Sequence, residues 1–83
     1  MIKIKLRPRD ELIVRKYVKE YSASEDKELF KEGLIEWRYF RIKFLKDHNI
    51  DYSKDYALAI LVEIFKQLGF KKELEECYKA FEE

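Results

Sequence analysis

The first residues of the chain alternate between apolar and cationic side chains in the segment IKIKLR at positions 2–7. A repeat of two residues is typical of a β-strand with one apolar face and one solvated face. Pro8 ends the pattern, because proline lacks a backbone donor and restricts the residue before it. A lone strand leaves its backbone groups unpaired, and the rest of the chain offers no second strand. We therefore expect this strand to need a partner.

Apolar residues recur at helical spacing after this strand. A first helix is predicted from Asp10, which is suited to capping, to about Tyr21. A second helix is predicted to follow a serine-led turn, with Ser22 or Ser24 as its cap, and to end at about Asp47. Their apolar stripes comprise Ile13, Val14, Tyr17, Val18 and Tyr21 in the first helix and Leu29, Phe30, Gly33, Leu34, Trp37, Phe40 and Phe44 in the second. We expect both stripes to be buried.

Two further helices are predicted in the C-terminal part. Asp51 or Ser53 is a suitable cap for a third helix that ends at Leu68. Gly69 followed by Phe70 is typical of a helix that ends in a left-handed glycine with a hydrophobic contact after it. We predict that the third and fourth helices form a hairpin that packs on the second helix.

The composition is that of one folded domain. The chain has 83 residues, 47% of them hydrophobic and 16% aromatic, which is too apolar for a disordered segment. We assign residues 1–83 to a single domain, with a core at 1–47 and a helical hairpin extension at 48–83. A domain of this size has a thin core, so a partner chain is a reasonable expectation.

Charge is distributed unevenly along the chain. Residues 1–46 carry 13 lysine and arginine residues against 8 acidic ones, whereas residues 47–83 carry 5 against 9. Four cations precede the first acid, and they are Lys3, Lys5, Arg7 and Arg9. A cluster of this kind favours an anionic partner, although short basic stretches are more often simply solvated.

The sequence predicts a cytoplasmic protein. No apolar run approaches the length of a membrane span, and we expect no signal peptide because Met1 leads directly into the charged alternation. A single cysteine, Cys77, excludes an internal disulfide. One glutamine and one asparagine among many lysines and glutamates are typical of hyperthermophile proteins, which points to a thermophilic source, archaeal or viral.

Catalytic chemistry is not indicated. His48 is the only histidine and lies at a predicted helix end, where polar capping explains it better than metal binding or proton transfer. Cys77 has no histidine predicted near it for activation, and the sequence has no glycine-rich phosphate loop. We therefore expect no enzyme, no cofactor and no metal. In the segment WRYFRIKF at 37–44, aromatic and basic residues interleave, and this favours either core packing or a stacking platform for bases.

The order of strand, helix, serine-led turn and longer helix across residues 2–42 resembles the ribbon-helix-helix family of DNA-binding regulators. The second helix is similar to the family pattern of a serine-led turn followed by Glu-Leu, an acid with a small residue, a leucine and an aromatic. The matching positions are Glu28, Leu29, Glu32, Gly33, Leu34 and Trp37. The resemblance covers about half of the chain, and the C-terminal hairpin is an addition that the minimal family fold does not need.

This resemblance implies a mainly α-helical fold and a homodimer in which two N-terminal strands pair into a ribbon. The ribbon would enter the major groove of double-stranded DNA, with Lys3, Lys5 and Arg7 reaching base edges and Arg9 beside them. The family also implies a phosphate held near Ser24, at the start of the second helix. The expected function is that of a homodimeric, sequence-selective transcription regulator.

A second interpretation remains open on the residues alone. The chain is then a protein-binding helical module, antitoxin-like or an adaptor, that acts through residues 50–83. Its apolar segment YALAILVEIF at 56–65 supplies the contact in that interpretation. Salt-sensitive duplex binding favours the first interpretation, and salt-insensitive capture of a folded protein favours the second.

Overall fold

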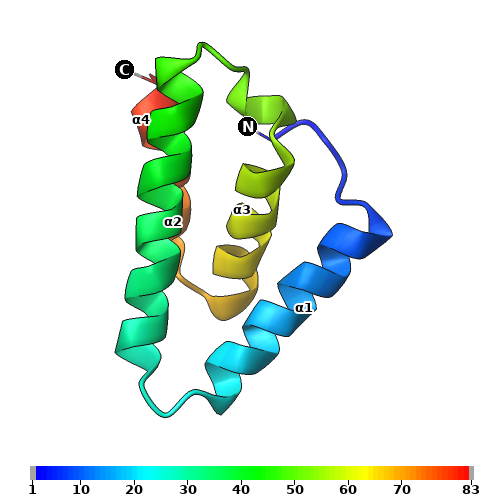
Figure 1. The fold of residues 1–83 in the computed structure, drawn as a ribbon, viewed down its shortest axis with the longest axis vertical. Coiled ribbons are helices and arrows are strands. Elements are labelled where there is room, and N and C mark those ends of the chain that lie inside the picture. The colour runs from blue at the N-terminus through cyan, green and yellow to red at the C-terminus, as the bar shows by residue number, and fades with distance from the viewer. Residues whose placement is uncertain (1, 83) are drawn as a thin grey trace.

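The computed structural model describes residues 2–82, with side chains to Phe81. These residues form four α-helices and one short 3-10 turn, and no strand or sheet occurs among them. The elements are α1 (Pro8–Ala23), α2 (Lys27–Asp47), the turn η1 (Tyr52–Lys54), α3 (Tyr56–Leu68) and α4 (Lys71–Glu82), as Figure 1 shows.

The predicted N-terminal strand is wrong. Residues 2–7 form an arm without regular secondary structure, with a bend at Ile4, and the Lys3 amide donates a hydrogen bond of 2.8 Å to the carbonyl of Ser53. The alternation itself persists, because Ile2, Ile4 and Leu6 are half-buried whereas the lysines between them are exposed. The arm's apolar side chains are thus covered by the chain's own helices, with Ile2 and Leu6 in its two hydrophobic clusters. Because residues 2–82 contain no strand, the predicted ribbon-helix-helix fold is wrong, and so is the predicted dimer that forms through this strand.

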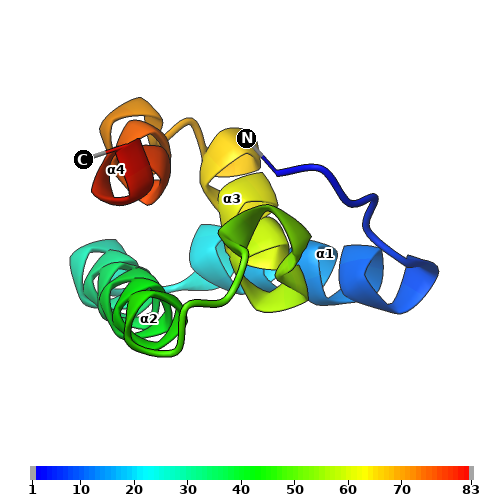
Figure 2. The ribbon, with the colours of Figure 1, turned by 90° about the horizontal axis from the view of Figure 1, so that it is seen from above.

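Helix α3 lies at the centre of the structure. Figure 2 shows it between α1, α2 and α4. Its sequence is apolar nearly all round, and its buried residues are Leu58, Ala59, Ile60, Leu61, Ile64 and Phe65. A helix that is apolar on every side must be buried by neighbours on every side. Helix α3, which was predicted as part of an appended hairpin, is therefore the central helix of the core. Helix α4 completes the hairpin and packs on both α2 and α3.

Aspartates begin three of the helices. Asp10 sits at the third position of α1 and accepts hydrogen bonds from the amide and the guanidinium of Arg7, while Pro8 occupies the first turn. Asp26, and not the predicted serines, caps α2 by accepting from the Leu29 amide at 3.0 Å. Asp55 caps α3 in the same way, at 2.8 Å from the Leu58 amide. Aspartate suits these positions because its carboxylate satisfies a free amide and opposes the positive end of the helix dipole.

The predicted glycine ending of α3 is confirmed. Gly69 adopts a left-handed conformation with φ of 76°, and the Phe70 amide returns to the carbonyl of Phe65 at 2.9 Å. This left-handed position favours glycine, because a side chain there meets the following backbone. The turn sends α4 back along α3, and Phe70 packs against the core at the base of the hairpin.

Candidate protein-interaction face

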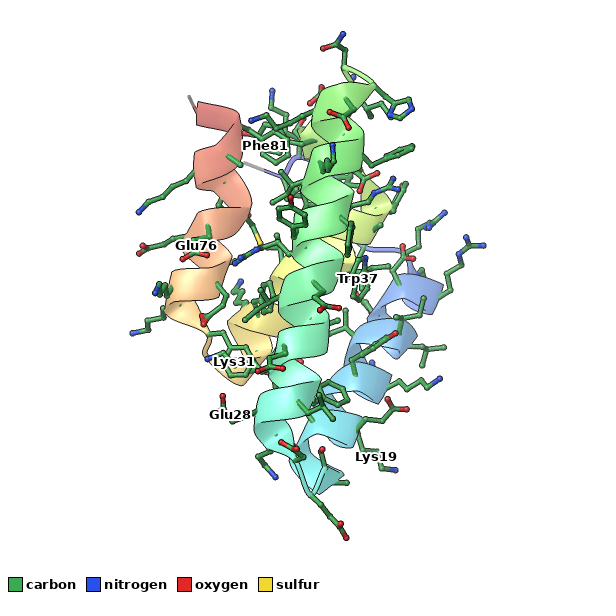
Figure 3. All side chains as sticks on the ribbon, turned by 60° about the vertical axis from the view of Figure 1, so that its left-hand side comes forward. Lys19, Glu28, Lys31, Trp37, Glu76 and Phe81 are labelled. Atoms are coloured by element: carbon green, nitrogen blue, oxygen red, sulfur yellow. The ribbon has the colours of Figure 1, made fainter. Side chains whose placement is uncertain are left out.

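A stripe of large apolar side chains on α2 faces outward. Leu29 is 64% exposed, Phe40 63% and Phe44 40%, and these residues follow one another along one side of the helix. Trp37 lies in the same stripe and is half-buried. Figure 3 shows Trp37 in the space between α2 and α1. The expectation that the whole stripe is buried is wrong, since the core covers only the side of α2 that carries Leu34, Ile42 and Leu45.

Helix α1 continues this surface across from α2. The Tyr17 ring packs against Trp37 and Phe30, with ring centroids 5.7 Å and 6.3 Å apart. Ile13 lies one turn before Tyr17 and is 38% exposed. A shallow groove of about 410 Å³ runs between the two helices, and its walls include Tyr17, Leu29 and Trp37. We name this surface the α1–α2 face, and its members are Ile13, Tyr17, Leu29, Gly33, Trp37, Phe40 and Phe44.

Gly33 lies in the middle of the α1–α2 face. Glycine inside a helix costs about 1 kcal/mol relative to alanine. A Cβ atom added at Gly33 would meet nothing within 4 Å, and the residue is exposed and lines the groove. No close approach within the chain therefore requires a glycine here. The missing side chain leaves an opening toward solvent at the centre of an apolar surface.

Charged residues border the α1–α2 face on its two long edges. On α1 the edge consists of Arg9, Lys16 and Glu20, which are all exposed. On α2 the outer edge consists of Glu32, Glu36, Lys43 and Asp47, also exposed. Lys43 and Asp47 pair with each other at 3.0 Å. The other five form no ion pair among residues 2–82, so the two edges keep opposite net charge, positive on α1 and negative on α2.

The five residues predicted to contact DNA do not form one site. Lys3 and Lys5 are exposed on the arm, and Arg9 is exposed in the first turn of α1. Ser24 lies past the other end of α1, a helix of 16 residues that is roughly 24 Å long. The Ser24 hydroxyl donates to the Asp26 carbonyl at 3.1 Å, and the Asp26 carboxylate occupies the amide end of α2 where the resemblance implies a phosphate.

Arg7 is held by contacts within the chain. Its guanidinium donates to both carboxylate oxygens of Asp10, at 2.7 Å and 3.0 Å, and lies 3.8 Å from the ring centroid of Tyr56. The hydrogen bond from Arg7 holds the pKa of Asp10 below its usual value, and the same bond raises the pKa of Arg7. This arrangement fixes the start of α1 against α3 and gives Arg7 a structural role.

His48 and Cys77, the two residues considered for catalysis, both pack against other parts of the chain. The His48 Nδ1 atom lies 2.9 Å from the Phe44 carbonyl, and its ring packs on Phe44 at 4.3 Å between centroids. Cys77 is fully buried, and this burial raises the pKa of its thiol to about 12. Within the described part of the chain, no three His, Cys, Asp or Glu side chains gather as a metal site would require.

The C-terminal hairpin presents a different surface from the one predicted for partner binding. The apolar side chains of α3 are occupied by the core, and the exposed residues of α4 are charged, namely Lys71, Lys72, Glu75 and Lys79. Most of the large apolar side chains that are exposed lie on α1 and α2, and Ile50 is the one within the described part of the predicted segment. One sequence signal indicated it: the apolar residues of α2 occupy an arc wider than the stripe of roughly 100° that a single core contact needs.

Comparisons with protein-family models, with characterised proteins and with solved structures return no match for this chain. None of the helices described for residues 2–82 has the length and apolar character needed to cross a membrane.

Proposed function

We propose that this protein is a helical protein-interaction module that binds another polypeptide chain through its α1–α2 face. The observation that carries this proposal is the contiguous exposed apolar stripe of Leu29, Phe40 and Phe44 beside the half-buried Trp37. Apolar side chains scattered singly over a surface are ordinary, but a contiguous patch of them with a charged border is typical of a binding surface.

The chemistry of the face fits a protein partner. Its members are mainly aromatic or aliphatic, and aromatic residues are enriched at the centres of protein interfaces. The charged residues lie at its edges, where they remain hydrated while the centre is dried by contact. The groove is shallow, which suits the side of a helix better than a small molecule that must be enclosed.

A photo-crosslinking experiment tests this function in the cells that naturally express the protein. A benzophenone amino acid is placed at Phe40, on the exposed stripe of α2, and in a second variant at Ile50. Ile50 is the control, because it is an apolar residue that is 42% exposed outside the face, where it lines a groove with Ala80 and Phe81 of α4. We expect a defined protein adduct from position 40 that is absent from position 50 and is lost when Leu29→Glu is added. If both positions give the same protein adducts, or if position 40 gives none, the proposed function is wrong.

Double-stranded DNA is a second candidate partner, favoured by a separate surface. Lys3 and Lys5 on the arm and Arg15 on α1 are exposed and form no ion pair among residues 2–82. Arg15 lines a groove together with Ile4 and Leu6, so it lies next to the arm. These cations suit phosphate contacts, which would bind a duplex without reading its sequence.

A further inference from the structure

We infer that the polypeptide bound by the α1–α2 face is an amphipathic helix of a different protein, with lysine or arginine along its border, which lies along α2 and places one apolar side chain over Gly33. This inference rests on the proposed function and names the chemistry of the partner. It uses the exposed stripe of α2 and the groove beside it, and it requires no contact along the length of α1.

The exposed stripe of α2 has the length of a helix-binding surface. The stripe runs from Leu29 to Phe44, which is roughly 22 Å along the helix axis. A partner helix of about four turns would cover this length. Such a helix presents its apolar anchors at every third or fourth position, and these anchors pack between the side chains of the helix that receives them.

The groove lies where α1 and α2 are close together. The two helices meet at the turn of residues 24–26 and diverge from it, with α3 between them (Figure 1). The walls of the groove include Tyr17 from α1 and Leu29 and Trp37 from α2. Gly33 is exposed between them, and a Cβ atom added there would meet nothing within 4 Å. Since Leu29 and Trp37 lie one turn on either side of Gly33, an apolar anchor of the partner has room to enter between them.

The charge beside the groove is negative. Glu32 and Glu36 on the outer edge of α2 are exposed, and neither forms an ion pair within residues 2–82. They are four positions apart, so their like charges repel each other across one turn of the helix. On α1, Lys16 and Glu20 carry opposite charges, which leaves the two glutamates of α2 in excess. A basic border on the partner relieves the repulsion between them, whereas a nucleic acid or an anionic membrane would increase it.

The fluorescence of Trp37 reports whether the groove is occupied, because Trp37 is the only tryptophan in the chain and lines the groove. The probes are two synthetic helical peptides of about four turns, which share one leucine stripe and carry either lysine or glutamate at all other positions. In low salt we expect the lysine peptide to shift the Trp37 emission to shorter wavelength and to bind more than about tenfold tighter than the glutamate peptide. Equal affinity of the two peptides, or no shift with the lysine peptide up to about 1 mM, overturns the inference.

Substitutions locate the bound peptide on the surface. Gly33→Leu fills the opening without meeting other atoms of the chain, and it should weaken binding of the lysine peptide more than about tenfold. Glu36→Lys should weaken binding by about two- to fivefold in low salt. Glu75→Lys is the matched control, because it makes the same charge change at an exposed position of α4. Circular dichroism at 222 nm checks that each variant is folded. Binding that is indifferent to Gly33→Leu, or weakened equally by the two charge variants, overturns the inference.

The crosslinked adduct at position 40 separates this inference from the proposed function. Mass spectrometry of the adduct identifies the partner segment that contacts the face, and we expect a basic amphipathic segment. An acidic segment, or a segment from a second copy of this chain, would overturn the inference and leave the proposed function in place. The absence of any adduct at position 40 would overturn both.

Discussion

The paired roles of Asp55 give the sharpest test of how the fold is held together. Asp55 is 8% exposed, caps α3, and forms an ion pair with Arg41 of α2 through both oxygens of its carboxylate. One guanidinium contact is 2.9 Å, from the Arg41 Nε atom to Oδ2. The side chain of Arg41 is 31% exposed. Asp55 thereby connects the start of α3 to the middle of α2.

Two substitutions separate these roles. Asp55→Asn keeps an oxygen that can cap the helix but removes the charge, whereas Asp55→Ala removes both. Loss of a cap costs about 1 kcal/mol, and loss of hydrogen bonds to a charged group costs roughly 1.5–3 kcal/mol. We therefore expect Asp55→Ala to lower the free energy of unfolding by about 3 kcal/mol and Asp55→Asn by about 2 kcal/mol.

The matched control is Asp26→Ala in α2. Asp26 makes the same capping contact, at 3.0 Å, but is exposed and forms no ion pair within residues 2–82. Its loss should cost only the cap, about 1 kcal/mol. Urea unfolding followed at 222 nm measures all three variants, with a slope of about 1 kcal/mol per molar urea for a chain of this size. The reasoning is refuted if Asp55→Ala costs no more than Asp26→Ala.

The same ion pair predicts how stability changes with pH. Burial would raise the pKa of Asp55, but hydrogen bonds from Arg41 and the Leu58 amide outweigh it and hold the pKa below its usual value. A carboxyl group with a lower pKa in the folded state contributes stability that is complete above its unfolded pKa of about 3.9. This contribution is lost as the pH falls through the folded pKa. Asp55→Asn should flatten the decline of stability below about pH 4, and an unchanged profile would contradict the assignment.

Three further predictions concern other parts of the chain. Gly33→Ala should raise the free energy of unfolding by about 0.5–1 kcal/mol, measured by urea unfolding, because the new methyl group meets no neighbour. Cys77 should resist a thiol reagent at pH 8 in the native protein and react fully in denaturant, since it is buried with a pKa of about 12; rapid native labelling would contradict its position. If the arm binds duplex DNA, fluorescence anisotropy at several salt concentrations should show that replacing Lys3 and Lys5 with alanine lowers the salt slope by about 1.8, two phosphate contacts at 0.9 each.

Helix positions were predictable because their signals are local. The predicted ends at Asp47 and Leu68 match the structure, and the left-handed Gly69 follows from the Gly-Phe pair alone. Caps were less predictable, because serine and aspartate near residues 22–26 are almost equally suited to the role. The arm was misread for a different reason. In the structure Ile2, Ile4 and Leu6 are half-buried against the helices although the arm has no strand partner and bends at Ile4. An alternation of apolar and charged residues therefore predicts which side chains are covered, and does not by itself predict a sheet.

The candidate site depended on information that periodicity does not contain. The pattern identified Leu29 and Phe40 as apolar positions of α2, but not how much of the apolar arc other helices would cover. How much of the apolar arc of α2 is buried depends on the position of α3. That position is set by contacts between residues far apart in the sequence. The ion pair between Arg41 and Asp55 could not be predicted for the same reason, since the two residues are 14 positions apart. The unpaired edge residues Lys16 and Glu36 became meaningful only after the surface between them was known to be exposed.

The central position of α3 also has a consequence for synthesis of the chain. Helix α1 packs more extensively on α3 than on its sequence neighbour α2. Because translation delivers the N-terminal part first, α1 and α2 leave the ribosome before the helix that should bury them. The nascent chain therefore carries uncovered apolar stripes until Tyr56–Leu68 emerges. We therefore expect cooperative folding to begin late in translation. A ribosome that stalls before α3 is made would expose the apolar surfaces of α1 and α2, which chaperones bind.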